Sequence, residues 1–156
     1  MIINTLYKTD TIIDGIKYNL PSQTINNGYI IQLIWKNEND KNHNDNGPAF
    51  IQYYSNGNIQ YKEWCINNER HNENGPAFIA YYENGNIQYK EWWTNNKRHN
   101  ENGPAYIEYD ENGNAEYKSW FINGQRHNEN GPAYIKYDQS GNIIKQEYWE
   151  NGIRIK

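Results

Sequence analysis

Four histidines recur at a fixed spacing of 28 residues, and histidine is the side chain most often used for acid–base catalysis and for metal binding. They are His43, His71, His99 and His127. Each stands in nearly the same surroundings, because Asn-x-Asn-Gly-Pro-Ala follows every one of them. A residue that recurs in every copy of a repeat is first explained by what every copy must do, which is to pack on its neighbours.

The repeat spacing argues against a shared metal ion. If each repeat adds two strands about 4.8 Å apart, equivalent histidines lie roughly 10 Å apart, whereas zinc-bound nitrogens lie about 2 Å from the ion. No Ser or Thr recurs beside the histidines, so a pair of nucleophile and base has no support. We therefore expect each histidine to pack or hydrogen-bond at the turn of its own hairpin. We expect no enzyme, no metal site and no cofactor.

Acidic and amide side chains give further candidate patterns. The run Asn42-x-Asn44-x-Asn46-Gly47 resembles the start of a calcium loop, but its twelfth position is Tyr53, where such a loop needs a bidentate glutamate. Ordinary turn residues explain this run better. Glutamates two residues after a histidine are expected to be solvated; these are Glu73, Glu101 and Glu129. Glutamates that alternate with Lys62 and Lys90 are predicted to be surface cover; these are Glu63 and Glu91.

The elements that position these residues are β-hairpins. In the copy that begins at His99, residues 104–109 alternate and are rich in β-formers, Asn112-Gly113 is a strong hairpin turn, and residues 115–121 return. A second Asn-Gly at 123–124 precedes a short arm at 125–127. Helical periodicity is absent. The sequence predicts an all-β fold, an antiparallel meander of hairpin repeats in a single or shallowly rolled sheet, with two strands per 28-residue repeat.

Two registers are compatible with the turn at Asn56-Gly57. A two-residue turn places Ala49 opposite Trp64, whereas a three-residue turn with Gly57 in a left-handed bulge shifts the pairing by one. Register follows the hydrophobic pattern. The second option gathers more apolar side chains on one face, namely Ala49, Ile51, Tyr53, Ile59 and Tyr61, and is the one that we favour. Phe50, Tyr54 and Trp64 then lie on the opposite face.

Composition excludes several functional classes. The 156 residues are 36% hydrophobic and 15% aromatic, which suits a thin fold covered by half-wet rings. The net charge is -4 without a basic cluster, which argues against nucleic acid as a partner and makes a membrane unlikely. The single cysteine, Cys65, excludes an internal disulfide and stands where other copies carry Trp93, Phe121 and Trp149. Neither a signal peptide nor a membrane span is recognisable, so we expect a cytoplasmic protein.

The repeat boundaries follow the histidines. Residues 1–28 fall outside the pattern and are predicted to form a capping segment, which a repeat array needs at its open edge. Residues 29–156 form the array, with a partial unit at 29–42 and full units at 43–70, 71–98, 99–126 and 127–156. A tryptophan precedes each of the four histidines and is expected to be structural like the histidine; these are Trp35 (followed by Lys36), Trp64, Trp92 and Trp120. In the last unit Tyr148 stands at the tryptophan position.

The pattern Tyr-x-x-Glu-Trp-x-x-Asn-x-x-Arg-His followed by a strand and Asn-Gly resembles the MORN repeat. The matching residues are Tyr61, Trp64, Asn67, His71 and Gly85, then Tyr89, Trp92, Asn95, His99 and Gly113, then Tyr117, Trp120, Asn123-Gly124, His127 and Gly141. The unit departs from that family in its extra length, with residues 72–76 inserted, and in lacking the glycine between Tyr and Trp. It is similar to degenerate repeats of phage and giant-virus proteins. The resemblance implies a scaffold, a dimerisation rod or a lipid contact, not an enzyme.

The copies differ at positions that could form a contact surface. Phe50, Tyr54, Phe78 and Tyr82 are aromatic in the first half, whereas their equivalents are Tyr106, Asp110, Tyr134 and Asp138. Exposed aromatic patches often mark interfaces. We therefore expect a non-enzymatic protein-interaction or scaffold module with a protein partner, and self-association through a sheet edge or the aromatic face. The alternatives are a small-ligand or glycan-binding module that uses the aromatics, and a membrane-peripheral rod.

Overall fold

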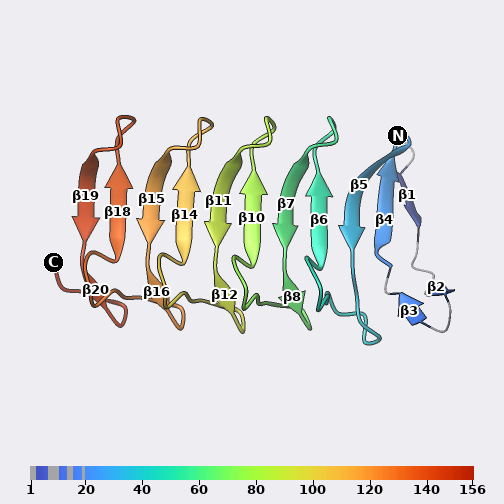
Figure 1. The fold of residues 1–156 in the computed structure, drawn as a ribbon, viewed down its shortest axis with the longest axis horizontal. Helices are drawn as coiled ribbons and strands as arrows, with labels where there is room; N and C mark the ends of the chain where they lie inside the picture. The colour runs from blue at the N-terminus through green and yellow to red at the C-terminus, as the bar shows by residue number, and fades with distance from the viewer. Residues whose placement is uncertain (1–2, 7–10, 14–15, 19) are drawn as a thin grey trace.

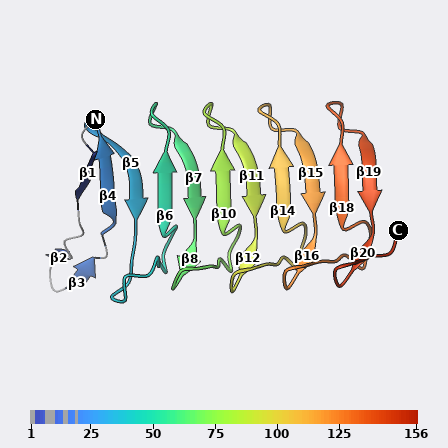
Figure 2. The same cartoon turned by 180° about the vertical axis from the view of Figure 1, so that it is seen from behind.

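The computed structural model describes residues 3–6, 11–13, 16–18 and 20–156, with side chains described from residue 20 onward. Within these residues the fold is all-β and contains no helix. One open sheet of eleven strands runs the length of the molecule in the order β1-β4-β5-β6-β7-β10-β11-β14-β15-β18-β19. Figures 1 and 2 show a single layer with its strands across the long axis and the two chain ends at opposite ends. The predicted antiparallel meander of hairpins is confirmed, and the sheet is not closed into a barrel.

The long strands come from two sources. The region before the first full repeat supplies β1 (Ile3–Leu6), β4 (Ser22–Asn26) and β5 (Tyr29–Ile34). The repeats supply β6 (Phe50–Tyr53), β7 (Ile59–Glu63), β10 (Phe78–Tyr81), β11 (Ile87–Glu91), β14 (Tyr106–Tyr109), β15 (Ala115–Ser119), β18 (Tyr134–Tyr137) and β19 (Ile143–Glu147). Each repeat therefore adds two strands to the sheet, as predicted.

Each repeat also forms a second, very short hairpin at one end of the long strands (Figure 1). These ribbons are β8–β9 (Cys65–Ile66 and Glu69–Arg70), β12–β13 (Trp93–Thr94 and Lys97–Arg98), β16–β17 (Phe121–Ile122 and Gln125–Arg126) and β20–β21 (Trp149–Glu150 and Ile153–Arg154). Their turns are two residues long with positive φ at both, for example 55° and 71° at Asn67 and Asn68. Asparagine and glycine adopt this mirror-image turn most easily.

The register combines the two predicted options. Tyr54 N donates to Asn58 O, and Gly57 between them has a φ of 88°, so the turn is the favoured three-residue turn. A bulge between Gln52 and Tyr53 then shifts the pairing back, and Phe50 pairs with Glu63. The predicted common face is therefore wrong for Tyr61, which shares a face with Phe50. The physical reason is that β7 also pairs with β10, so two ladders decide its register, not its own hairpin alone.

The two faces of the sheet differ in chemistry. Cross-strand pairing places seven aromatic rings on one face, which we term the ring face; they are Phe50, Tyr61, Phe78, Tyr89, Tyr106, Tyr117 and Tyr134. The opposite face alternates isoleucine and lysine in one row, from Ile51 through Lys62 to Ile79 and onward. Lys62 lies 5.9 Å from the centre of the Tyr81 ring of the next repeat, and Lys90 and Lys118 repeat the contact.

The core is thin, as the composition predicts. The fully buried apolar residues are the alanines of the Gly-Pro-Ala segment, Ala49, Ala77, Ala105 and Ala133, each 0% exposed. Their backbones continue the sheet, since Ala77 N donates to Glu91 O and Trp64 N donates to Ala77 O. The described part of the protein has no thick interior. Its single layer is covered from both sides by aromatic rings, lysine stems and arginines.

The predicted capping segment extends the topology of the repeats without their sequence. β1 pairs with β4 and β4 with β5, and a short ribbon of β2 (Thr11–Ile13) and β3 (Ile16–Tyr18) lies between β1 and β4 in the chain. Residues 1–2, 7–10, 14–15 and 19 of this segment lie outside the described residues. In the described part of the chain, no helix is long and apolar enough to cross a membrane.

Candidate functional site

The aromatic side chains of the ring face contact one another in series from Phe50 to Tyr106. The centroids of Phe50 and Tyr61 lie 5.3 Å apart with an angle of 3° between the rings, and Phe78 continues the stack at 5.3 Å. Tyr89 and Tyr106 follow at 5.5 and 5.9 Å. Such pairs add about 0.5–1.5 kcal/mol each beyond the area that they bury. The stack therefore couples each hairpin to the next.

Arginines from the short ribbons reach over this ring face. Each ribbon pairs its arginine with the first residue of its first strand, so Trp93 pairs with Arg98 and Phe121 pairs with Arg126. The guanidinium carbon of Arg98 lies 5.3 Å from the Trp93 ring and 5.2 Å from the Tyr106 ring. An arginine between two rings gains cation–π attraction on both sides and is held in one orientation.

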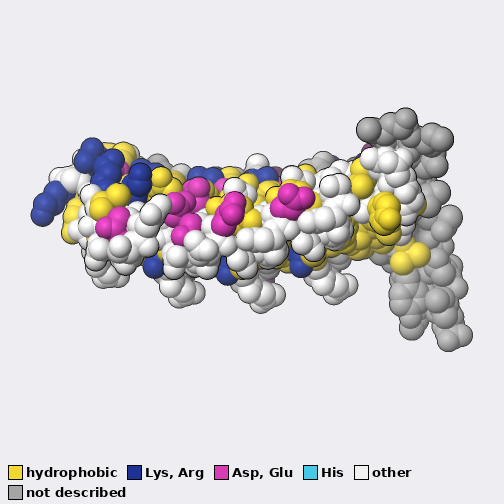
Figure 3. Space-filling view, turned by 90° about the horizontal axis from the view of Figure 1, so that it is seen from above, with side chains coloured by type: hydrophobic (Ala, Val, Ile, Leu, Met, Phe, Trp, Pro, Cys, Tyr) yellow, Lys and Arg dark blue, Asp and Glu magenta, His cyan; other side chains and the backbone are white. Residues whose placement is uncertain are grey.

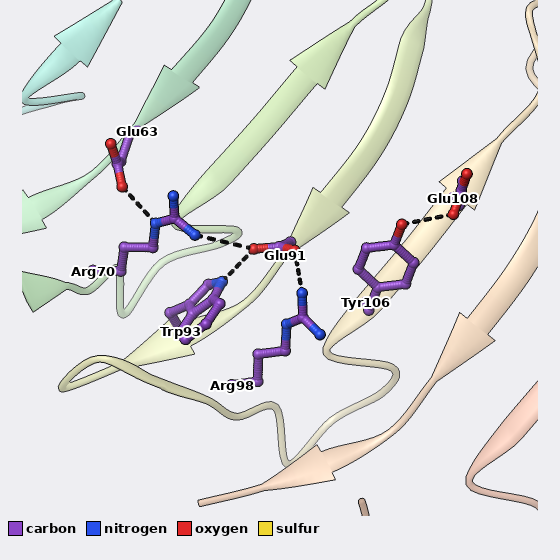
Figure 4. Close-up of polar contacts among 7 residues, drawn as sticks. All are labelled: Glu63, Arg70, Glu91, Trp93, Arg98, Tyr106 and Glu108. Carbon is purple, nitrogen blue, oxygen red and sulfur yellow. Dashed lines mark hydrogen bonds and ion pairs between the residues drawn. The ribbon is translucent and has the colours of Figure 1, made fainter. Parts of the chain in front are cut away.

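Glutamates at the ends of the long strands bridge these arginines. Glu91, which is 5% exposed, accepts hydrogen bonds from Arg70 at 3.4 Å, from Arg98 at 2.5 Å and from the indole nitrogen of Trp93 at 2.7 Å (Figure 4). Glu63 accepts from Arg70 at 2.5 Å. The result is an alternating row of carboxylate and guanidinium groups, which we term the Arg–Glu row.

The row continues at the C-terminal end with the same chemistry. Glu147 accepts from Lys145, which lies 2.8 Å away, and from the Trp149 indole at 3.1 Å. Arg126 and Arg154 lie 3.7 and 3.9 Å from its carboxylate. The hydrogen bond from Lys145 is the main reason that the pKa of Glu147 is lowered from its ordinary value. In the third repeat, Ser119 stands where the other repeats carry glutamate, and it is 4% exposed.

The prediction that Glu63 and Glu91 are surface cover is wrong for Glu91. Its strand position places it on the ring face opposite Phe78, between two arginines of adjacent repeats, and not among the lysines. The arginines themselves were missed. The available signal was that Arg70, Arg98 and Arg126 each precede a histidine at the repeat spacing, with a glutamate or Ser119 seven residues earlier.

The four histidines each reach the turn of the ribbon that follows them in the chain. Nδ1 of His71 accepts a hydrogen bond from Asn95 N at 3.3 Å, in the turn of the β12–β13 ribbon. The same bond forms at His43, His99 and His127, at 3.4, 3.1 and 3.2 Å. The imidazole of His71 therefore binds at a turn of its own unit, residues 71–98, as expected. Its backbone links that unit to the preceding one, since His71 N donates to Trp64 O.

The other ring nitrogen faces an acidic loop residue. Nε2 of His43 lies 3.2 Å from Asp45, and the later histidines lie 3.5–3.6 Å from Glu73, Glu101 and Glu129. The loop between histidine and proline is closed by its first asparagine, because Asn72 Nδ2 donates to Pro76 O and Asn72 Oδ1 accepts from Asn74 N. In the part of the chain that the structure describes, no three His, Cys, Asp or Glu side chains cluster in a way that could hold a metal ion.

The predicted interaction residues fall into two separate sets. Phe50 and Phe78 belong to the ring stack, where Phe78 is only 8% exposed. Tyr54 and Tyr82 lie beside the long hairpin turns, and their hydroxyls donate to Tyr81 O and Tyr109 O of the next repeat, both at 2.8 Å. The four residues therefore do not gather into one patch.

In the second half of the array, aspartates replace the two tyrosines that hydrogen-bond to the next repeat. Asp110 accepts from the backbone of Asn112 and Asn114 within its own turn, and Asp138 does the same with Ser140 and Asn142. At these positions, the predicted change from aromatic to acidic residues replaces a side chain that hydrogen-bonds to the next repeat with one that hydrogen-bonds within its own turn.

The tryptophans expected to be structural mark the junction between repeats. Trp64 N donates to Ala77 O of the next repeat, and its own carbonyl accepts from His71 N. The other tryptophans make the same two backbone bonds: Trp35 to Ala49 and His43, Trp92 to Ala105 and His99, and Trp120 to Ala133 and His127. Cys65 is buried, and burial raises the pKa of its thiol to about 12. A thiol of that pKa is not a nucleophile at neutral pH.

Comparison of the chain with protein-family models, with curated proteins and with solved structures finds no match.

Proposed function

We propose that this chain is a non-enzymatic protein-interaction or scaffold module built from MORN-like repeats, acting in the cytoplasm. The observation that carries the proposal is the open edge of the sheet at β19. β19 is the outer strand at the C-terminal end of the sheet, and Ile143 and Ile144 on it are 50% and 57% exposed. An edge strand with unpaired backbone groups and apolar side chains is a template for a strand from another chain.

The geometry of β19 identifies which backbone groups are free to pair. Ala133 N donates to Glu147 O, so the peptide of Glu147 faces β18. Because direction alternates along a strand, the N–H and C=O of Gln146 face the open edge. The edge ends at Tyr148, whose N–H donates to Lys156 O. A partner strand therefore has the stretch from Ile143 to Glu147 on which to pair.

The charge at this end favours an acidic partner. Lys145 and Arg154 are each 54% exposed along their side chains, and Lys156 is exposed. Figure 3 shows lysine and arginine side chains gathered at the C-terminal end beside one acidic group, whereas the other acidic side chains lie in separate groups along the array. Complementary charge accelerates association and sets the orientation of a partner.

The alternative of glycan binding by stacked aromatics has less support. A sugar ring needs an open aromatic face, but the rings from Phe50 to Tyr89 stack on one another, and arginines lie over Phe78 and Tyr106. The alternative of a membrane-peripheral rod has less support because the net charge is -4.

The experiment compares Gln146→Pro with Gln146→Ala as its matched control. Proline removes an N–H that faces the open edge and keeps the bonds to β18, so the fold should persist while edge pairing is lost. We expect light scattering and native mass spectrometry of the wild type at micromolar concentration to show a dimer, or one stoichiometric protein partner after capture from the native source. Gln146→Ala should retain this complex and Gln146→Pro should lose it.

A monomeric wild type that retains no protein partner contradicts the proposal. Retention of the wild type on a glycan array, lost when ring-face aromatics are replaced and unaffected by Gln146→Pro, favours the glycan-binding alternative instead.

A further inference from the structure

One position of the Arg–Glu row lacks its carboxylate. Glu63, Glu91 and Glu147 occupy equivalent positions 28 or 56 residues apart, and the remaining equivalent position is Ser119. By the pattern of Glu91, which binds Arg70 and Arg98 through its two oxygens, a glutamate at 119 would bridge Arg98 and Arg126. Two residues later the aromatic also changes, because Phe121 stands where Trp93 and Trp149 donate an indole N–H to a glutamate.

A cavity of about 320 Å³ occupies this place on the ring face. Its lining includes Ser119 and the two arginines that the missing carboxylate would have bridged, with Tyr106, Tyr117 and Phe121 among its walls. Nε of Arg98 and Nε of Arg126 are both buried and have no hydrogen-bond partner among the described residues. A buried donor without a partner is costly, and the cost is greater for a charged group.

The ring stack is interrupted at the same place. The Tyr89 and Tyr106 rings are in contact at 5.9 Å with a tilt of 31°, and the Tyr117 and Tyr134 rings at 6.2 Å with a tilt of 37°. Among the described residues no ring contact joins Tyr106 to Tyr117. The equivalent diagonal pairs in the two preceding repeats stack at 5.3 and 5.5 Å. Tyr106 and Tyr117, two of the rings that line the cavity, therefore expose to it the surface that the equivalent rings of the preceding repeats bury against each other.

The charges around the cavity define what it can hold. Its lining contains two guanidinium groups and one carboxylate, Glu108, which accepts a hydrogen bond from the Tyr106 hydroxyl at 2.6 Å. Outside the lining, Lys136 lies 5.2 Å from the Tyr117 ring centre. Arg98 also binds Glu91, and Arg126 lies 3.7 Å from Glu147. Those two glutamates are shared with Arg70, Lys145 and Arg154, and Arg70 also binds Glu63. With Glu108 included, these groups together leave an excess of about one positive charge, which suits a monoanion better than a dianion. A planar group with two oxygens matches two guanidinium donors best.

We infer that the cavity at Ser119 is a binding site for a carboxylate group, held between Arg98 and Arg126 with its apolar neighbour against the rings. The ligand takes the position that a glutamate fills in the other repeats. In assigning this carboxylate to a protein partner, as a Glu or Asp side chain or a chain terminus, the inference rests on the proposed function. A free small carboxylate offers the same chemistry, so the test distinguishes the two sources.

The first measurement uses the four arginines of the chain as internal reporters. The full-length protein is titrated with sodium acetate against sodium chloride at equal ionic strength, and the Nε–Hε signals are followed by NMR. We expect acetate to shift the signals of Arg98 and Arg126 and to leave those of Arg70 and Arg154 in place. Equal shifts of all four signals, or the same response to chloride, would overturn the inference.

The second measurement restores the carboxylate within the chain. Ser119→Glu should raise the melting temperature and abolish the acetate response, because the new side chain occupies the site. Ser119→Gln has the same shape without the charge and serves as the control; it should block the site without the same gain in stability. Arg126→Gln should weaken binding by about tenfold or more, since it removes a charged donor. Glu108→Gln should tighten binding. A destabilised Ser119→Glu, or one that still responds to acetate, would overturn the inference.

The third measurement identifies the source of the carboxylate. A short peptide that ends in a phenylalanine carboxylate is compared with its C-terminal amide and with acetate. We expect the acid peptide to bind at least about tenfold more tightly than acetate, because the rings add apolar contact, and the amide to lose binding. Equal binding of peptide and acetate would confine the site to free carboxylates and overturn its assignment to a protein partner. Gln146→Pro leaves this site intact, so the edge experiment and this one fail independently.

Discussion

Transplanting the third repeat's residue pair into the second repeat tests whether the Arg–Glu row stabilises the array. Glu91→Ser removes one acceptor from three donors, Arg70, Arg98 and the Trp93 indole. Hydrogen bonds to a charged group contribute about 1.5–3 kcal/mol each. The two arginine side chains are 32% and 35% exposed, so water replaces part of the loss. We expect Glu91→Ser to lower the free energy of unfolding by about 2 kcal/mol, and the melting temperature by about 4–8 °C for a chain of this size.

The companion change is Trp93→Phe, which copies Phe121. Alone it removes one donor from Glu91, and we expect it to lower the free energy of unfolding by about 1 kcal/mol. In the double variant the acceptor is already gone, so the indole N–H has nothing to lose. The two effects should therefore fall short of additivity by about 1 kcal/mol, well above the 0.3–0.5 kcal/mol scatter of independent sites.

The assay is urea unfolding of the wild type, both single variants and the double variant, followed by far-UV circular dichroism because a tryptophan is replaced. Glu63→Ser is the matched control. Among the described residues, the Glu63 carboxylate accepts a side-chain hydrogen bond from Arg70 only, so its loss should cost less stability than the loss of Glu91. Strict additivity, or an equal cost at Glu63 and Glu91, would refute the reasoning that one buried carboxylate ties two repeats and an indole together.

Three further predictions concern His99, Glu147 and Cys65. His99→Asn should lower the free energy of unfolding by about 1 kcal/mol through loss of the bond from Asn123 N, with no effect of zinc or chelator on melting; a chelator-induced drop of several degrees would show that the histidines bind metal. Because the pKa of Glu147 is lowered in the folded state, its contribution to stability is present above the ordinary value of 4.5 and is lost as the pH falls through the lowered pKa. Between pH 6 and pH 3 the melting temperature should therefore fall more steeply for the wild type than for Glu147→Gln. Parallel pH dependences of the two melting temperatures would count against this. Cys65, with a pKa of about 12, should resist iodoacetamide at pH 8 until urea unfolds the chain, and labelling of the native protein at the rate of a free thiol would contradict its burial.

The sequence by itself determined the elements that depend on neighbouring residues. Asparagine and glycine tolerate positive φ, so Gly57 and the pair Asn67-Asn68 fix where the chain turns, whatever packs around them. The strand content, the hairpin repeat, the open sheet and the thin core follow from those turns and from the alternation of aromatic residues between them.

Tertiary structure alone decided how one repeat meets the next. The bulge that moves Tyr61 onto the ring face arises because each strand must satisfy two neighbours at once. The bond of His71 to Asn95 and the bridge of Glu91 from Arg70 to Arg98 depend on the offset between one ribbon and the next. That offset is set by packing across the sheet, which no local pattern encodes. The same packing brings Arg98 and Arg126 to either side of Ser119, and so turns one small substitution into a charged cavity.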